Sequence, residues 1–326
     1  MKKRTKRILL RLCGWLIFAA AIVAIVLSVK ASKPNVYYGF IDKYLQRHAV
    51  DGLGEIKTVL DITDYFDPQT QIAHYAISDL QEGACEKITY DNTLFLINDG
   101  HFAPAESLSP LLETTALDGY GEVTMVSGAA ESLRALLDAA EAACGKRFTV
   151  GASFIDGKQE EADVGDECYM TAYYHTSEHL SGTSVDLYID GVTQKEYMTD
   201  VLAQWLMDHA WRYGFVIRYP FLEGEWTGVF FQPWHIRYVG ALHAALLYDS
   251  GMPLEEYLQK HYLKEEAFYS VEWTRDGVTD TYLIFCQVPY EGTLFVPTTL
   301  ADVSVSYDNT YGFYYVTGQY IGEEAG

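Results

Sequence analysis

Basic side chains are scarce in this sequence, and their scarcity excludes one large class of function. The chain has 23 Lys and Arg residues against 45 Asp and Glu residues, which gives a formal net charge of −22. Six of the basic residues precede Leu12, so the remainder of the chain is still more acidic. A surface with this charge repels phosphate groups, and we therefore expect no nucleic-acid partner.

Cysteine is also rare, with five residues in 326, and no two of them form a CxxC pair. A zinc site built from cysteine is therefore not expected. Cys13 lies in an apolar run, and the others are Cys85, Cys144, Cys168 and Cys286. Outside the cytoplasm these four thiols would allow two disulfides in three different pairings, among which the sequence does not choose.

A long uncharged apolar run opens the chain. Residues 12–29 contain no charged side chain and follow the six basic residues. A helix of about 18 or more apolar residues spans a bilayer, and a basic flank stays in the cytoplasm. We expect residues 1–30 to form a cytoplasmic flank and a transmembrane signal anchor, with the rest of the chain outside. A cleaved signal peptide ending near Ala31 is the alternative, and it gives the same localisation.

The sequence contains no repeat and no low-complexity tract. We therefore infer the domain organisation from the spacing of apolar residues. Residues 31–93 are interpreted as a stalk or extension. Residues 94–262 have the pattern of a compact α+β domain, with a small antiparallel sheet and flanking helices. In residues 263–326 apolar and polar side chains alternate, with a turn signal at Asp276-Gly277, which predicts a small C-terminal β module.

Within the middle domain the patterns predict a specific order of elements. In chain order they are a strand-like run at 94–97, a helix at 131–143 ended by Gly145, a strand at 183–189, a helix at 195–213, paired short strands at 215–219 and 229–231 around a polar loop at 223–225, and a helix at 237–249 ended by Gly251.

Two short motifs in this domain carry side chains that suit a metal. The segment SEHLSGTSVD places His179 and Asp186 seven residues apart across a turn at Gly182, and QPWHIRYVG supplies His235. Two imidazoles and one carboxylate form a three-ligand zinc set that leaves one position open for water. An open position suits hydrolysis, because zinc activates water and polarises a carbonyl. Each residue taken singly would more often be an ordinary hydrogen-bonded side chain.

The segment TSEHLSGTSVDLYI resembles the SxHxxGxAxD signature of the zinc D-alanyl-D-alanine carboxypeptidases. The segment QWLMDHAWRYGFVIRYPFLEGEWTGVFFQPWHIRYVG is similar to the VanY-type block that ends in EPWHxRYVG. The similarity covers roughly Leu94 to Gln259 in the same order and spacing. It implies a zinc-peptidase fold in which His179, Asp186 and His235 bind Zn²⁺.

The resemblance also implies a place and a substrate. The chain would be a single-pass protein of the bacterial cytoplasmic membrane that acts on the terminal D-Ala of peptidoglycan stem peptides outside the cytoplasm. Arg237 belongs to the motif of the last ligand and is a candidate catalytic residue. Ser177 and Trp234 are candidate substrate-binding residues, although Trp234 also fits a packing role.

Two positions depart from the family pattern. The family carries a Glu general base three residues before its second His ligand, where this chain has Gln232. An amide cannot accept that proton, and losing a general base typically lowers the rate by on the order of 10²–10⁴. Where the family usually has the sequence SGYR, this chain has Ser-Gly-Ala-Ala at residues 127–130. The family Arg, which is suited to binding a carboxylate, is therefore replaced by Ala130.

Other side chains are candidates to replace the missing groups. Arg134 follows Ala130 by one helical turn and is a candidate for substrate binding, although simple loss is the stronger interpretation. Glu178, Glu223 and Glu225 are weak candidates for the base. Two hypotheses therefore stand beside each other: a zinc carboxypeptidase, and an impaired zinc-binding relative that recognises wall peptides or a partner. A scaffold without metal is disfavoured because all three ligand types are present.

Overall fold

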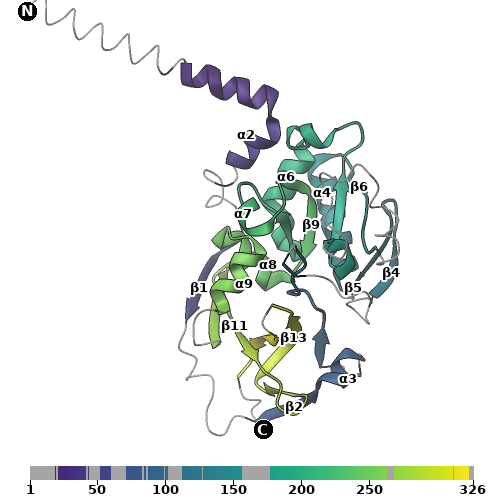
Figure 1. The fold of residues 1–326 in the computed structure, drawn as a ribbon, viewed down its shortest axis with the longest axis vertical. Coiled ribbons are helices and arrows are strands. Elements are labelled where there is room, and N and C mark those ends of the chain that lie inside the picture. Colours follow the sequence, from purple (N-terminus) through teal and green to yellow (C-terminus); the bar gives the residue numbers. More distant parts are fainter. Residues whose placement is uncertain are drawn as a thin grey trace, which may run out of the picture.

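A computed structural model gives the fold of the chain (Figure 1). It describes residues 19, 21–41, 43, 52–59, 71–82, 84–85, 87–98, 100–101, 112–126, 128–155, 177–262, 268–310 and 312–322. Residues 1–18 and 20 of the predicted flank and anchor lie outside this set. Among the described residues no helix is both long and apolar enough to cross a membrane. The anchor therefore stays a prediction.

A four-stranded antiparallel sheet carries both motifs. Its strand order is β6 (Thr149–Val150), β7 (Ser184–Tyr188), β9 (Gln232–Tyr238) and β8 (Phe215–Tyr219). Strands β7 and β9 are direct neighbours, and their register pairs Asp186 with His235. Branched and aromatic side chains such as Val185, Ile236 and Phe215 are fully buried, which is what such residues favour in a sheet. The predicted small antiparallel sheet is confirmed.

Helices cover this sheet, as Figure 1 shows for α4 and α6. Helix α4 (Ala129–Cys144) buries a stripe at helical spacing that includes Leu133, Leu136 and Leu137. It ends at Gly145, whose φ of 67° lies in the left-handed region that glycine adopts without strain. The helix predicted at 131–143 and its stop are thus confirmed.

The helix predicted at 195–213 is divided into three parts, namely η4 (Gln194–Thr199), α6 (Val201–His209) and η5 (Ala210–Tyr213). Asp200 causes the first division. Its backbone is extended, and its side chain caps α6 by accepting a hydrogen bond of 3.0 Å from the backbone N–H of Leu202. An Asp between two apolar stretches is a typical N-cap signal, which the continuous prediction overlooked.

The segment around His235 also differs from its prediction. The strand expected at 229–231 begins only at Gln232, and the helix expected at 237–249 begins at Ala241 as α8 (Ala241–Ser250). Gly240 separates strand from helix with φ 79° and ψ 157°, a conformation that favours glycine. Between β8 and β9 the predicted polar loop contains a short helix, α7 (Gly224–Thr227). His235 and Arg237 consequently lie on a strand.

The run Leu94 to Ile97 is buried but does not form the predicted strand. Side chains satisfy part of its backbone. Ser306 accepts a hydrogen bond of 2.9 Å from the N–H of Leu94. Asn309 accepts one of 2.9 Å from the N–H of Leu96 and donates one of 2.7 Å to its carbonyl oxygen. Side-chain partners of this kind leave no periodic signal in the sequence.

A second, six-stranded sheet contains most of the C-terminal part. Its order is β1 (Glu55–Val59), β10 (Phe268–Arg275), β11 (Val278–Gln287), β14 (Phe313–Tyr320), β13 (Leu300–Asp308) and β3 (Ile88–Tyr90). Strand β12 (Thr293–Pro297) pairs separately with β2 (Ile72–Ala76). The β-rich character predicted for this part is confirmed. Both edge strands of the sheet, β1 and β3, come from the segment interpreted as a stalk.

The two sheets are joined by helices and by a shared core. Helix α8 and helix α9 (Leu254–Tyr262) pack against β10, β11 and β14 through one buried cluster that includes Leu246, Leu258 and Val271. The remaining described elements are α2 (Pro34–Ile41), α3 (Ile77–Gln81), β4 (Leu112–Leu117), β5 (Gly121–Val126) and η3 (Glu178–Ser181).

The cysteines show no disulfide framework in the described part of the chain. Cys85, Cys144 and Cys286 are free thiols, and Cys168 lies outside the described residues. Any arrangement of two disulfides among these four would join two of the three free ones. None of the three arrangements considered from the sequence is therefore present.

We predict that Asn309→Ala lowers the free energy of unfolding by about 1–3 kcal/mol, because it leaves two backbone groups of buried Leu96 without partners. Urea denaturation followed by circular dichroism measures the change. Gln319→Ala is the matched control, since Gln319 only donates to Asp280 at the partly exposed end of β14. Equal effects of the two substitutions would contradict the role given to Asn309.

Candidate metal centre

Three side chains from neighbouring elements converge on one point. His179 lies in η3, Asp186 on β7 and His235 on β9. Their potential ligand atoms all lie within 4.8 Å of one another, and among the described residues these three form the metal-binding group. The two histidines are buried, and the Asp186 side chain is 13% exposed. The structure thus brings together the three predicted ligands, which we call the triad.

The local sequence explains how His179 and Asp186 reach the same point. Gly182 ends η3 with φ 67°, which turns the chain from the His179 turn into β7. A Cβ atom at this position would also meet the Leu112 side chain at 2.1 Å and would displace it. Ser177 begins the turn, and its hydroxyl accepts a hydrogen bond of 3.4 Å from the backbone N–H of His179. The structure therefore places Ser177 as a cap of the turn that holds a ligand.

One nitrogen of each imidazole faces the Asp186 carboxylate, and the other nitrogen has no partner among the described residues. His235 Nδ1 lies 2.7 Å from Asp186 Oδ1, and His179 Nε2 lies 3.7 Å from Asp186 Oδ2. His179 Nδ1 and His235 Nε2 are buried and have no hydrogen-bond partner among the described residues. The nitrogen atoms that face the carboxylate are the other two, His179 Nε2 and His235 Nδ1, and with Asp186 they form the set of two imidazoles and one carboxylate that zinc takes. The donor set fits zinc.

The electrostatics of the triad favour the protonation states that bind metal. Burial opposes ionisation of Asp186, but hydrogen bonds with His179 and His235 outweigh it and hold its pKa below the ordinary value. Burial lowers the pKa of His235, although the Asp186 carboxylate acts in the opposite direction. An ionised carboxylate and a neutral imidazole are the forms that coordinate a cation.

Aromatic residues support the triad from outside. The Tyr188 hydroxyl donates a hydrogen bond of 2.9 Å to Asp186 Oδ2. The Tyr219 ring stacks on the His235 ring, with centroids 5.0 Å apart. Trp234 is buried and packs edge-on against Tyr197, so the structure places it in the core of the domain. Sequence reasoning had singled out neither Tyr188 nor Tyr219.

Gln232 opens the strand that holds His235. It pairs with Tyr219 of β8, and the register shifts just beyond it, because Ile217 pairs with Ile236. Residues 233–235 therefore lie opposite the single residue Arg218. In a regular strand residues three apart point to opposite faces, but a bulge breaks that alternation. Gln232 and His235 are for this reason not forced onto opposite faces of the sheet.

Arg237 lies inside the protein, in a buried ion cluster that we define as Glu178, Arg218, Arg237 and Glu255. Its guanidinium pairs with Glu178 and donates hydrogen bonds to backbone carbonyl oxygens, one of them that of Thr93 at 3.0 Å. Glu178 also accepts a hydrogen bond of 2.7 Å from Arg218 Nε. Arg218 in turn binds both carboxylate oxygens of Glu255, at 2.7 and 2.9 Å.

The buried ion cluster removes Glu178 from the candidates for a general base. Burial opposes its ionisation, but Arg218 and Arg237 outweigh this and lower the pKa of Glu178. A carboxylate paired with two guanidinium groups has no tendency to accept a further proton. Sequence reasoning assigned no role to Arg218, yet a charged residue inside the apolar strand FVIRY was a signal that a buried partner exists.

The structure gives the other candidate replacements surroundings of their own. Ala130 is buried in α4, and Arg134 donates a hydrogen bond of 3.1 Å to the carbonyl oxygen of Ala116 on β4. Glu223 forms an ion pair with Lys43, and Glu225 is exposed on α7. None of these side chains belongs to the metal-binding group among the described residues.

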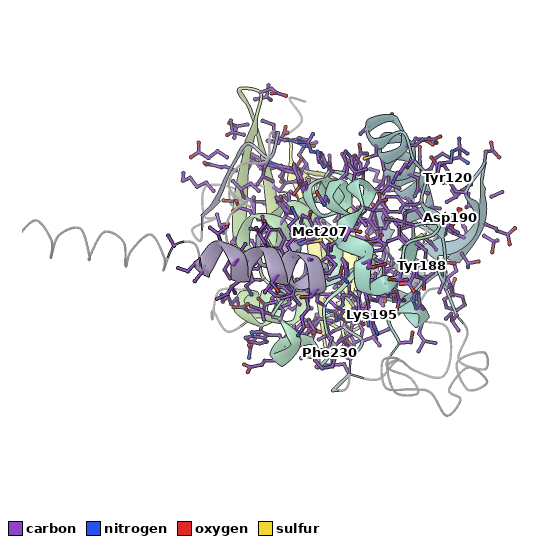
Figure 2. All side chains as sticks on the ribbon, turned by 90° about the horizontal axis from the view of Figure 1, so that it is seen from above. Tyr120, Tyr188, Asp190, Lys195, Met207 and Phe230 are labelled. Carbon is purple, nitrogen blue, oxygen red and sulfur yellow. The ribbon has the colours of Figure 1, made fainter. Side chains whose placement is uncertain are left out.

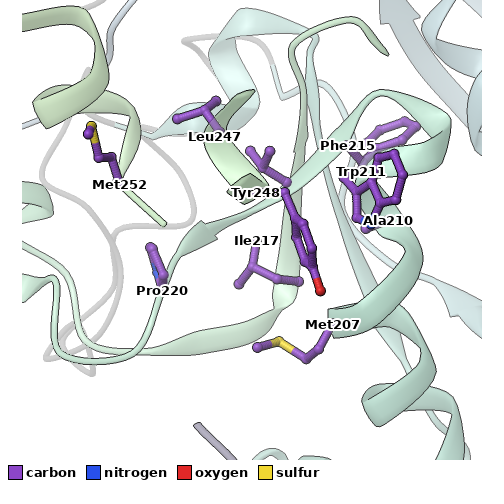
Figure 3. A pocket seen from close by; sticks show the side chains of 10 residues that line it. Met207, Ala210, Trp211, Phe215, Ile217, Pro220, Leu247, Tyr248 and Met252 are labelled. Atoms are coloured by element: carbon purple, nitrogen blue, oxygen red, sulfur yellow. The ribbon is translucent and has the colours of Figure 1, made fainter. Parts of the chain in front are cut away.

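An apolar pocket elsewhere in the domain is separate from this centre (Figure 3). It has a volume of about 50 Å³ and lies between α6, η5, β8 and α8. Its lining includes Met207, Trp211, Ile217 and Leu247, and no member of the triad lines it. A cavity of this size holds a few water molecules at most, so it is a packing void rather than a peptide site.

Comparison with known proteins identifies the family. The profile of the VanY family, described as D-alanyl-D-alanine carboxypeptidase, matches residues 124–241. A D-alanyl-D-alanine carboxypeptidase of Enterococcus faecium is 30% identical over 227 residues, which cover 66% of this chain and 72% of the relative. This chain belongs to the VanY family. The region matched by the profile contains the whole triad as well as Gln232 and Arg218.

Two solved structures extend the comparison. The vancomycin-resistance D,D-dipeptidase VanXYg, in complex with a D-Ala-D-Ala phosphinate analogue, covers 82% of this chain and 100% of its own length. It shares the fold, with a TM-score of 0.59 at 21% identity. A mutant of the D,D-pentapeptidase VanY in complex with Zn(II) is 31% identical, covers 51% of this chain and 98% of its own length, and has a TM-score of 0.42.

We predict that Tyr188→Phe weakens zinc binding about 10–100-fold, because it removes the hydrogen bond that orients the Asp186 carboxylate. Competition with a chromophoric chelator measures the dissociation constant. Tyr197→Phe is the control, since its hydroxyl donates to the Leu187 carbonyl oxygen and not to a ligand. Equal zinc affinity in wild type and Tyr188→Phe would contradict the prediction.

We also predict that Glu178→Ala lowers the free energy of unfolding by about 3–5 kcal/mol, because it leaves Arg237 as an uncompensated buried charge. Thermal and urea unfolding measure the change. Glu272→Ala, which removes an exposed pair with Lys57, is expected to change stability by about 1 kcal/mol or less. Similar losses in both variants would show that Glu178 is not an anchor of the fold.

Proposed function

We propose that this member of the VanY family binds Zn²⁺ through the triad and releases the terminal D-Ala from peptidoglycan stem peptides. The observation that carries the proposal is the convergence of His179, Asp186 and His235, whose potential ligand atoms all lie within 4.8 Å of one another. Three protein ligands of this type are characteristic of catalytic zinc sites, which keep a position open. A relative crystallised with Zn(II), and another with a D-Ala-D-Ala analogue, support the choice of metal and substrate.

The residues of this chain have distinct tasks in the proposed reaction. Zinc, when bound, would supply Lewis acidity toward a peptide carbonyl and toward water. Asp186 provides the negative charge, Tyr188 fixes its orientation, and Tyr219 holds the His235 ring by stacking. Gln232 can donate and accept hydrogen bonds and so can orient a water molecule, but its amide cannot take a proton. The expected activity is therefore slow.

The alternative is an impaired relative that keeps zinc in order to recognise wall peptides or a partner. Two observations favour it, namely Gln232 at the base position and Ala130 at the position of the family Arg. The structure supplies no carboxylate other than Asp186 to the metal-binding group among its described residues. Removing a base reduces a rate without abolishing it, so we propose the slow enzyme first.

We further propose that the protein acts outside the cytoplasm, held at the bacterial membrane by a helix formed from residues 12–29. The apolar length of this run and its basic flank support the proposal. Exposed Ile22, Val23 and Ile25 on the described part of this segment are consistent with a lipid environment. Peptidoglycan stem peptides are accessible on the outer side.

The test measures D-Ala release from a stem pentapeptide by the zinc-loaded protein, with zinc content determined for each variant. We predict slow release by the wild type, and an increase of about 10²–10⁴ in kcat for Gln232→Glu, because this change restores a proton acceptor. His235→Ala should lose zinc and activity together. Gln319→Glu introduces the same chemical change far along the chain, on β14, and is the matched control.

The outcomes separate the two functions. Slow wild-type turnover that rises in Gln232→Glu supports the enzyme. A wild type that binds zinc but releases no D-Ala, while Gln232→Glu is active, favours the binding role. Activity that persists in His235→Ala would contradict both proposed functions, because each of them depends on zinc bound by the triad.

A further inference from the structure

A band of exposed apolar side chains lies on α2 and on the loop between β8 and β9. In this loop, residues 220–231, the exposed fractions are 60% for Leu222, 41% for Trp226 and 82% for Phe230. Helix α2 adds Val36 and Phe40, which are 42% and 50% exposed and stand four residues apart on one side of the helix. We call these five residues the apolar band. Figure 2 shows Phe230 at the surface seen from the side of the N-terminal helix.

Direct contacts hold the loop and α2 together. Gly39 packs so closely on the Phe221 ring that a Cβ atom at Gly39 would lie 2.7 Å from it. Lys43, just beyond α2, forms an ion pair with Glu223 and donates a hydrogen bond of 3.4 Å to the Phe221 carbonyl oxygen. Phe40 and Leu222 are the chain neighbours of the two contacting residues Gly39 and Phe221. These contacts place α2 beside the loop, so the apolar band lies on two adjoining elements.

Leu222 is a large apolar residue at a backbone position that favours glycine. Its φ is 64°, in the left-handed region that disfavours residues with a Cβ atom. Glycine would relieve this strain, and an exposed leucine gains little from burial in return. A large apolar side chain in a strained backbone position, 60% exposed, points to a role outside the folded chain.

The position of the apolar band in the chain indicates what it contacts. Helix α2 follows the segment 21–32, in which Ile22, Val23, Ile25, Val26 and Leu27 are 42–63% exposed. Residues 21–29 of that segment are the second part of the apolar run proposed as the membrane anchor. Trp, Phe and Leu are the residues with which proteins enter the interface of a bilayer. The strongly acidic chain makes attraction to anionic headgroups an unsuitable alternative, so insertion has to be apolar.

We propose that the apolar band inserts into the interfacial layer of the same membrane that holds the anchor. This inference rests on the proposed localisation. The loop of residues 220–231 runs directly into Gln232 and the strand that carries His235. Docking of the band fixes the orientation and height of the triad above the membrane, because the loop is braced against α2 on one side and β9 on the other.

The experiment uses the full chain in nanodiscs of phosphatidylcholine, with and without brominated acyl chains, which quench tryptophan fluorescence by contact. We expect brominated lipid to quench the tryptophan fluorescence of the wild type more than that of the Trp226→Phe variant. The difference between the two measures the quenching of Trp226. Trp273→Phe is the control, because Trp273 is 3% exposed and lies on β10 of the six-stranded sheet, and it should leave the quenching unchanged. Trp15→Phe reports separately on the anchor.

Two further variants separate docking from folding. Phe230→Ser and Leu222→Gly should each reduce the quenching of Trp226, and Leu222→Gly should raise Tm because it relieves the positive φ. These losses should persist at high salt, since no charge is involved. A Leu222→Gly variant with lower Tm and unchanged quenching would show that Leu222 serves the fold, which would overturn the proposal.

The failure of docking is distinguishable from the failure of the anchor. Quenching of Trp15 without quenching of Trp226 keeps the anchor and overturns the docking of the loop. Quenching of neither overturns both.

Discussion

The arrangement of the domain around the metal centre depends on the buried ion pairs of Glu178. Glu178 accepts hydrogen bonds from Arg218 on β8 and pairs with Arg237 on β9, while the next residue in the chain is the ligand His179. Two buried guanidinium groups are unfavourable without their carboxylate, so the turn η3 is fixed against the sheet. Because β7 and β9 are paired in register, Asp186 and His235 then meet His179 at one point.

The same cluster links the metal centre to the C-terminal sheet. Arg237 donates a hydrogen bond to the carbonyl oxygen of Thr93. The backbone N–H groups of Leu94 and Leu96 donate to Ser306 and Asn309 of the C-terminal part. Phe95, Ile97 and Leu180 form a small buried group against which Tyr307 packs. The turn that carries His179 is therefore supported from two sheets, and the β-rich part is a structural component of the site's surroundings.

Sequence reasoning predicted the parts that depend on periodicity and on short motifs. The stripe of α4, the strands around Val185 and Ile217, and the grouping of His179, Asp186 and His235 all have such signals. It failed where side chains replace regular backbone pairing, as Asn309 does for Leu96, and where one cap divides a helix, as Asp200 does. The partners of Arg218 are distant in sequence, so no local pattern could reveal them.

In the proposed function, the triad is a zinc site with nitrogen and oxygen ligands and one open position. X-ray absorption spectroscopy at the zinc edge of the zinc-loaded protein tests it most directly. We expect one zinc per chain, with nitrogen and oxygen neighbours at about 2.0–2.2 Å, two of them imidazoles, and one neighbour from solvent. A sulfur shell at about 2.3 Å, or a protein that retains no zinc, would contradict it.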